Sequence, residues 1–340
     1  MDRKWIWALM ALVLVAGGGL VMWQATDRDP ADDTPVAVAA PGGAAAGTGE
    51  PTFTRLENPA RTEVRDGGGR VVAVFTDGAR TVRLTGRERT FSEPRFTKAT
   101  VTTDAWIRLA PREWRAGAEK AGWFKPWLDK ALADRSPDAL AIMMDYIDGA
   151  KPRRNADGLQ TAGDASFGPL SATDPDGRAE NSDFYDYLGV SWKFPDGKKE
   201  QPSRSHFRAL DCSGYIRMVY GYRMKYPLRG TNTKGTGLPR RAYAMAEFGP
   251  GVQLMPNTGR AVRDFELLQP GDLLFFNAGP IGGKHIEHSG IYLGLDDSGR
   301  HRFISSRSKA DGPTMGDFGG DSLLDGGGYW ATKLRTARRI

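Results

Sequence analysis

Cys212 and His288 are the two residues whose types and spacing are best suited to covalent chemistry. Cys212 is the single cysteine of the 340-residue chain, and His288 is one of four histidines. A thiolate is a strong nucleophile, and an imidazole can take the thiol proton and later return one to a leaving group. Taken alone, Cys212 and His288 fit either a catalytic pair or a buried thiol and a histidine without catalytic function. The secondary-structure elements that position the two residues distinguish these interpretations.

The segment around Cys212 predicts a helix that begins at the cysteine, with Asp211 as its N-cap. Apolar residues follow at helical spacing, namely Tyr215, Ile216, Val219 and Tyr222. A helix N-terminus favours negative charge, so it stabilises a thiolate there. Its first-turn amides also point toward the sulfur and toward an oxyanion formed beside it.

His288 opens an apolar strand predicted over residues 288–295, and a base on a strand is held rigidly. His285 and His206 lie in predicted loops and are weaker candidates. Further strands are predicted at 273–276, 302–305 and 334–340. One helix followed by antiparallel strands indicates an α+β fold.

Three blocks in this order carry a resemblance to a known family. They are Asp211–Tyr215 (DCSGY), Leu268–Phe276 (LQPGDLLFF) and His288–Gly294 (HSGIYLG). Together they resemble the NlpC family of bacterial cell-wall cysteine peptidases. The resemblance implies a papain-like domain at residues 206–340, with N-terminal helices packed on an antiparallel sheet. It also implies that Cys212 attacks a peptide bond of the peptidoglycan stem, typically between D-γ-glutamyl and a diamino acid, with His288 as base.

The resemblance implies roles for further residues. By position, Asp211 and Ser213 would line the pocket for the free amino end of the stem, and Ser305 would orient the base. His301, four residues earlier on the same predicted strand, is the alternative orienting residue. No metal and no cofactor is predicted, because His285 and His288 lack further ligands at useful spacing.

Departures from the family pattern leave other functions open. A Tyr-x-Trp-Gly-Gly segment is missing before Cys212, and Tyr185, Tyr187 or Trp192 would have to fill the pocket instead. The alternative is therefore an amidase or acyl transferase on another wall-linked amide. A hydroxyl at Ser305 stabilises an imidazolium weakly, which favours a third hypothesis, a catalytically weak wall-binding protein.

The insertion over residues 307–328 is rich in glycine and aspartate. It departs from the family pattern in length. Two interpretations fit a segment of this composition: a lid over the cleft, or slack chain without a role.

The N-terminal part of the chain predicts export. Arg3 and Lys4 precede an apolar stretch from Trp5 to Trp23, about as long as a membrane span requires. Residues 1–25 are therefore predicted to be a signal anchor, or a signal peptide if cleaved. Residues 26–52, rich in Ala, Gly and Pro, read as a flexible linker. The protein is expected to be extracytoplasmic, held in the cell membrane by this N-terminal helix or secreted.

Residues 53–152 predict an accessory region of mixed strands and helices. A hairpin is expected around Asp77–Gly78, a strand over 100–109, and helices over 112–121, 124–133 and 137–147. Residues 153–205 read as a long loop-rich connection to the peptidase domain.

The net charge of +6 and the isoelectric point of about 9.3 allow binding to anionic wall polymers. Nucleic acid is not an expected partner, since the chain has no nucleic-acid motif.

Overall fold

The computed structural model describes residues 49–174 and 177–340. The predicted anchor or signal, residues 1–25, and nearly all of the predicted linker lie outside these ranges. No helix within them has both the length and the apolar character needed to cross a membrane. All paired strands described below are antiparallel, and helices accompany them, so the predicted α+β class is confirmed.

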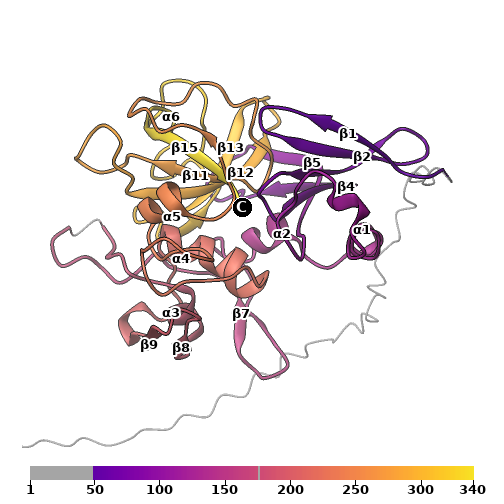
Figure 1. Cartoon of the computed structure of the whole chain (residues 1–340). Helices are drawn as coiled ribbons and strands as arrows, with labels where there is room; N and C mark the ends of the chain where they lie inside the picture. Colours follow the sequence, from indigo (N-terminus) through magenta and orange to yellow (C-terminus); the bar gives the residue numbers. More distant parts are fainter. Residues whose placement is uncertain (1–48, 175–176) are drawn as a thin grey trace, which may run out of the picture. The chain divides into compact units, whose positions relative to one another are not determined.

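The accessory region opens with a five-stranded meander (Figure 1). Its strands follow one another in chain order: β1 (Thr52–Leu56), β2 (Arg61–Arg65), β3 (Val71–Thr76), β4 (Thr81–Ser92) and β5 (Thr100–Leu109). The hairpin predicted at Asp77–Gly78 is confirmed, because β3 pairs with β4 on either side of it. Gly78 has a φ of 80°, which a residue with a side chain rarely adopts.

Three short helical elements follow this sheet. They are the 3-10 turn η1 (Ala118–Lys120), α1 (Phe124–Ala133) and α2 (Ala139–Met144). The predicted helix over 124–133 is confirmed, and the one over 137–147 is shorter than predicted. The helix predicted over 112–121 is wrong, because Trp114 is fully buried and its amide binds the Ala79 carbonyl instead.

The segment from 153 to 205 holds short elements within long loops. They are β6 (Arg153–Arg154), β7 (Gln160–Ala162), α3 (Phe184–Leu188), β8 (Trp192–Lys193), β9 (Lys199–Glu200) and the 3-10 turn η2 (Arg204–His206). Sequence analysis missed α3, which a capping box between Asp183 and Asp186 begins and Gly189 ends.

A six-stranded antiparallel sheet forms the C-terminal half. Its spatial order is β10 (Val252–Met255), β15 (Leu334–Arg339), β11 (Leu273–Phe276), β12 (His288–Leu295), β13 (His301–Arg307) and β14 (Gly312–Thr314). The predicted strands at 273–276 and 288–295 are confirmed in full. The last strand, β15, lies inside the sheet between β10 and β11 rather than at its edge.

The helix predicted at Cys212 is present as α4 (Cys212–Ile216), continued by the π-helix η3 (Arg217–Arg223). It packs against β12 and β13. Its buried Tyr215, Ile216 and Val219 share one core with Ile291 and Ile304 of the sheet. Val101 and Ile107 of β5 and Leu140 of α2 belong to the same core, so the accessory region packs directly on the elements that carry Cys212.

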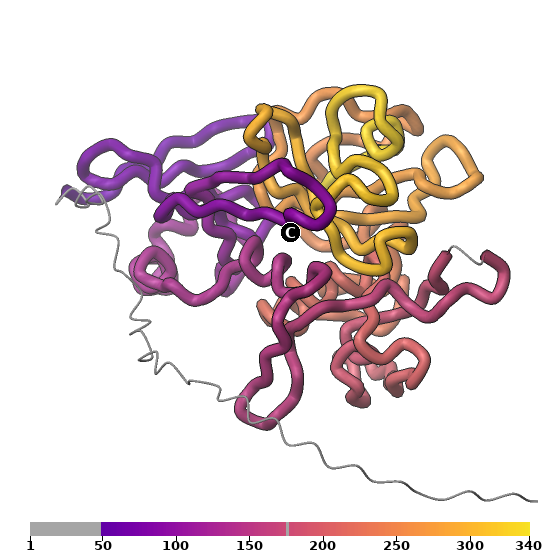
Figure 2. Tube along the Cα trace, turned by 180° about the vertical axis from the view of Figure 1, so that it is seen from behind, coloured from indigo at the N-terminus to yellow at the C-terminus, as the bar shows by residue number. Residues whose placement is uncertain are grey.

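A second core cluster includes side chains from the six-stranded sheet and from α6 (Tyr329–Lys333). It includes Phe276, Tyr292, Phe303 and Trp330. The remaining helix, α5 (Ala242–Phe248), contacts β11, β12 and β15. Seen from behind, the strands of the accessory region lie beside the C-terminal segments (Figure 2). Hydrogen bonds from the Arg80 and Thr81 amides to the Ile340 carbonyl join the two.

Candidate active site

Cys212 is the first residue of α4, and the structure confirms Asp211 as the N-cap. The Asp211 carboxylate accepts a hydrogen bond of 2.8 Å from the Gly214 amide. A Cβ atom at Gly214 would meet the Ser182 carbonyl oxygen at 2.1 Å, so the first turn needs glycine there to pack this closely. Cys212 is 6% exposed. The thiol is thus fixed at the start of a helix that has little freedom to move.

The structure brings Cys212 to the main chain directly before His288. The Cys212 sulfur lies 4.0 Å from the Glu287 carbonyl oxygen. Burial dominates the electrostatics of the thiol and raises its pKa. The sulfur therefore lies at the end of β12 that His288 opens.

His288 is packed among aromatic side chains and is 7% exposed. The Trp330 ring lies 4.4 Å from the imidazole at an interplanar angle of 33°, and the Phe276 ring lies 5.9 Å away. Within the described residues, the buried Nε2 atom has no hydrogen-bond partner. The imidazole is held mainly by ring contacts.

Burial keeps both groups of the pair uncharged. Burial, followed by the charge of Arg307, lowers the pKa of His288 to about 3. Burial, followed by the carboxylates of Asp211 and Glu180, raises the pKa of Cys212 to about 12. At neutral pH the resting state is therefore a thiol and a neutral imidazole. No hydrogen bond joins them among the described contacts, and apo sites often tighten only with substrate.

Neither candidate for the orienting residue hydrogen-bonds to His288 in the part of the chain that is described. Ser305 is fully buried, and its hydroxyl accepts a 3.0 Å hydrogen bond from Nε of Arg307. His301 pairs with Leu295, at the end of β12 away from His288. Its Nδ1 lies 2.7 Å from the Tyr292 hydroxyl. The orienting role of Ser305 stays a prediction.

Asp211 and Ser213 lie together, and both bind Arg240. The guanidinium contacts Asp211 Oδ2 at 2.7 Å, Asp211 Oδ1 at 3.2 Å and the Ser213 hydroxyl at 2.7 Å. Burial opposes the ionisation of Asp211, but the charge and hydrogen bonds of Arg240 outweigh it and lower the pKa of the carboxyl. The guanidinium of Arg240 therefore already binds the two side chains that are predicted to bind the free amino end of the stem peptide.

Asp211→Asn is expected to destabilise the fold by about 1.5–3 kcal/mol at pH 7, because the buried guanidinium of Arg240 loses one of its two carboxylate partners and keeps only Asp183. Urea denaturation would measure the loss. Since the folded pKa of Asp211 is lowered, its contribution is present above the unfolded value near 4 and disappears as pH falls below it. The gap between variant and wild type should thus shrink in acid.

Asp104→Asn is the matched control for this change. Asp104 pairs with Arg83 at 2.8 Å, but its side chain is 45% exposed. Its loss should leave the urea midpoint within error of wild type. Equal midpoints for Asp211→Asn and wild type at pH 7 would contradict a charge pair that stabilises the site.

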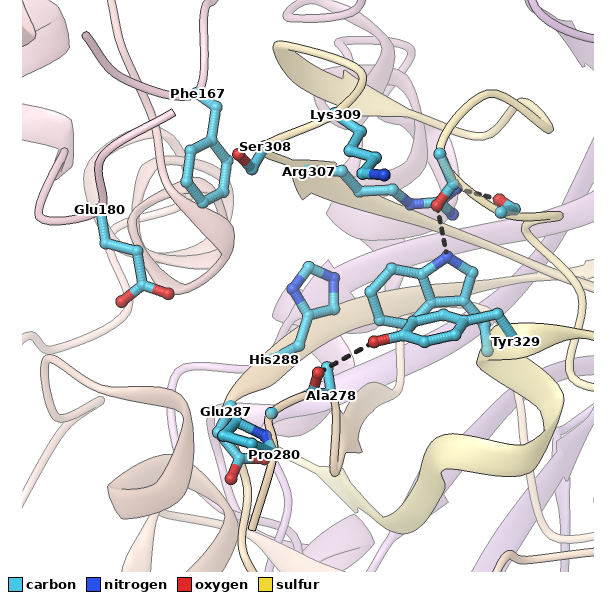
Figure 3. A pocket seen from close by; sticks show the side chains of 14 residues that line it. Phe167, Glu180, Ala278, Pro280, Glu287, His288, Arg307, Ser308, Lys309 and Tyr329 are labelled. Atoms are coloured by element: carbon cyan, nitrogen blue, oxygen red, sulfur yellow. Dashed lines mark hydrogen bonds between the residues drawn. The ribbon is translucent and has the colours of Figure 1, made fainter. Parts of the chain in front are cut away.

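His288 lines a pocket of about 920 Å³ (Figure 3). Carboxylates of Glu180 and Glu287 and the basic side chains of Arg307 and Lys309 also line it. The other lining residues are Phe167, Ala278, Gly279, Pro280, Ser308, Gly319, Gly320, Tyr329 and Trp330. The described lining does not include Cys212. A substrate in this pocket would reach the sulfur at the edge of the pocket formed by Glu287 and His288.

The three aromatic residues proposed to fill the substrate pocket lie in different surroundings. Tyr187 is fully buried, with its hydroxyl on the Gly163 carbonyl, and the Trp192 ring packs 5.0 Å from the ring of Phe184. Tyr185 lines a separate pocket with Arg240. None of the three belongs to the described lining of the His288 pocket.

Sequence analysis missed Arg240, Arg307 and Trp330. Only Arg307 had a signal: it lies two residues after Ser305 on the same strand, and strand periodicity puts both on one face. In the part of the chain that the structure describes, no group of three or more His, Cys, Asp or Glu side chains is placed to hold a metal ion.

A cysteine at the start of a helix, beside a histidine that opens a strand of the adjoining antiparallel sheet, is an arrangement suited to thiol-based hydrolysis. Residues 191–312 match the NlpC/P60 family. The chain thus contains an NlpC/P60 family domain in its C-terminal region. Members of this family are typically cysteine peptidases that act on peptidoglycan.

Similarity to other known proteins is more distant. A crystal structure from Staphylococcus aureus subsp. aureus Mu50, described as similar to lipoprotein of the NLP/P60 family, is 19% identical. The match covers 66% of this chain and 54% of that one, with a TM-score of 0.26. The chain thus spans about half the length of that protein, and at this TM-score the likeness carries no structural inference. No curated protein matches.

Proposed function

We propose that the protein is an extracytoplasmic cysteine endopeptidase of peptidoglycan stem peptides, with a papain-like C-terminal domain. One observation carries the proposal: the Cys212 sulfur lies 4.0 Å from the carbonyl oxygen of Glu287, the residue before His288, inside an NlpC/P60 domain. The scissile bond is that between D-γ-glutamyl and a diamino acid. The predicted N-terminal anchor or signal would place this domain outside the cytoplasm, where anionic wall polymers are available to its basic surface.

The proposed reaction uses Cys212 as nucleophile and His288 as general base. His288 takes the thiol proton as the sulfur attacks the scissile carbonyl carbon, and a thioester to the γ-glutamyl group forms as the C–N bond breaks. The imidazolium gives its proton to the leaving amine. Water then adds to the thioester with His288 again as base, which releases the acid and restores the thiol.

The neutral resting pair suits this route. A neutral imidazole is ready to accept a proton, whereas an imidazolium is not. Proton transfer needs the imidazole and the sulfur within hydrogen-bond reach, so substrate binding has to bring the two side chains together. A substrate that enters between Glu180 and His288 contacts both the ring and the main chain beside the sulfur.

Incubation of the full chain with purified muropeptides should release one new amine for each bond cleaved. Each pair of products should exceed the mass of the substrate by one water, because hydrolysis adds water across the bond. Mass spectrometry would identify the bond. Reduced, folded wild-type protein that yields no new amine from any muropeptide would contradict the proposal.

A second candidate, an amidase or acyl transferase on another wall-linked amide, is favoured by Arg240. Its guanidinium binds Asp211 and Ser213, so a substrate with a free amino end would have to compete with it for these side chains. A substrate whose amino end is already acylated would not. The same mass measurement separates the two reactions, since transfer adds the mass of an acceptor instead of water.

A further inference from the structure

Arg307 and His288 lie at the same end of the neighbouring strands β13 and β12. Ile291 pairs with Ile304, and Tyr292 pairs with Phe303. Pairing between the two strands ends at Ile291–Ile304, and counting on from that pair brings Arg307, the last residue of β13, level with His288, the first residue of β12. Cross-strand partners share a face of the sheet, so both side chains lie on the face that Trp330 covers.

Arg307 is held in one place by several acceptors. It is 2% exposed. Its Nε donates to the Ser305 hydroxyl, and its two terminal nitrogens donate to the Gly320 carbonyl and to the Ser322 hydroxyl. Its guanidinium carbon lies 5.1 Å from the centre of the Trp330 ring. Burial lowers the pKa of Arg307 to about 9, so the group is still charged at neutral pH.

The indole ring of Trp330 contacts both the Arg307 guanidinium and the His288 imidazole. Its ring packs on the imidazole at 4.4 Å with the two planes tilted by 33°, and its indole N–H donates to the Gly319 carbonyl at 3.3 Å. Figure 3 shows Arg307 and His288 among the side chains that line the pocket. The imidazole of His288 therefore has the Trp330 ring on one side and the charge of Arg307 nearby. Its Nε2 atom has no hydrogen-bond partner among the described residues.

The accessory region fixes the loop that supplies these acceptors. The Glu93 carboxylate accepts hydrogen bonds from the Thr314 hydroxyl at 2.7 Å and from the Met315 amide at 2.8 Å. The rings of Phe96 and Phe318 stack at 5.6 Å. The segment at 307–328 is thus a structured support for Arg307, tied to residues far away in the sequence.

We propose that Arg307 and Trp330 are positioning residues that fix the imidazole plane of His288 by stacking and charge, in place of a third residue that hydrogen-bonds to the base. The inference rests on the proposed function of His288 as general base. Arg307 can only donate hydrogen bonds and stays charged, so it favours the neutral form of the base.

Other charged groups near His288 act against or alongside Arg307. Asp211 at the start of α4 favours the imidazolium. Glu180, Glu287, Lys309 and Tyr329 line the same pocket, and the thiol of Cys212 lies at the Glu287 carbonyl. Trp330 and Phe276 contribute no charge, so Arg307 is the cation from the opposite strand whose removal should move the titration of His288.

The test combines histidine NMR titration and pH-rate profiles on the full chain. Arg307→Met is expected to raise the pKa of His288 by about one unit, because a nearby cation is lost. The acidic limb of kcat/KM should move to higher pH by the same amount. Arg307→Lys keeps the charge but loses the multiple hydrogen bonds, so kcat should fall about tenfold with the limb unmoved.

Two further variants keep the test decisive if Arg307→Met does not fold. Trp330→Leu removes the stacking wall, so kcat should fall with KM nearly unchanged, and water access should raise the pKa of His288. Arg302→Lys is the matched control: Arg302 is 3% exposed on the same strand and binds the Met315 carbonyl, but it does not line the pocket in the described chain.

The outcomes separate this inference from the proposed function. An unshifted His288 titration in Arg307→Met and in Trp330→Leu, or equal effects of Arg302→Lys and Arg307→Lys, would overturn the positioning role. The NMR titration needs no turnover, so it decides the inference even if wild type cleaves no muropeptide. Absence of cleavage by wild type would instead count against the endopeptidase.

Discussion

Cys212→Ala is expected to lower kcat/KM for muropeptide cleavage by at least ~10⁴-fold, to the background rate. The chain has no second cysteine, so no other thiol can take over the attack. The change removes one sulfur atom from a residue that is 6% exposed, and the fold should survive it. Release of new amines, measured beside circular dichroism and a thermal melt, would check both parts.

The two histidines of the 285–288 segment provide the control for this prediction. His288→Gln should reduce turnover nearly as far as Cys212→Ala, since the attack then lacks its base. His285 lies exposed in the loop before β12, and His285→Gln should leave kcat/KM within about twofold of wild type. Activity retained in purified Cys212→Ala protein would end the assignment of Cys212 as nucleophile.

Local sequence patterns predicted the elements that carry the candidate site because those patterns and the tertiary contacts agree there. The apolar run at 273–276 follows a Pro-Gly-Asp turn and is the buried centre of the sheet. Apolar residues at helical spacing after Cys212 became the face of α4 and η3 that packs on that sheet. Asp211 can cap the helix with its own side chain, which requires no distant partner.

The failures share a different cause, which is dependence on distant residues. Residues 112–121 have helical composition, but the buried indole N–H of Trp114 bonds to Thr62 on β2 and the main chain there bridges to Asp77. The glycines of the segment at 307–328 are compatible with a chain that has no structural role. In the structure, however, carbonyls of this segment accept hydrogen bonds from Arg307. No local pattern shows that Arg240 binds the side chains of Asp211 and Ser213, which lie 29 and 27 residues before it.

Alkylation of resting Cys212 is expected to be roughly 10³-fold slower at pH 7 than alkylation of free cysteine. With a pKa of about 12, the thiolate fraction of Cys212 is far below that of a thiol with a pKa near 8.5. The rate with iodoacetamide should rise about tenfold per pH unit from pH 7 to 10. Free cysteine should level off above its own pKa, so the slope identifies the cause even if burial also slows the reagent.

The slope also tests how His288 acts on the thiol. A neutral imidazole does not stabilise a thiolate, so His288→Gln should leave the pH dependence of alkylation nearly unchanged while it removes turnover. Fast alkylation with a plateau below pH 7, lost in His288→Gln, would instead demonstrate a preformed thiolate–imidazolium pair. The steep slope would mean that the thiol stays protonated until substrate binds. The proton would then pass from Cys212 to His288 only as the sulfur attacks the bound carbonyl carbon.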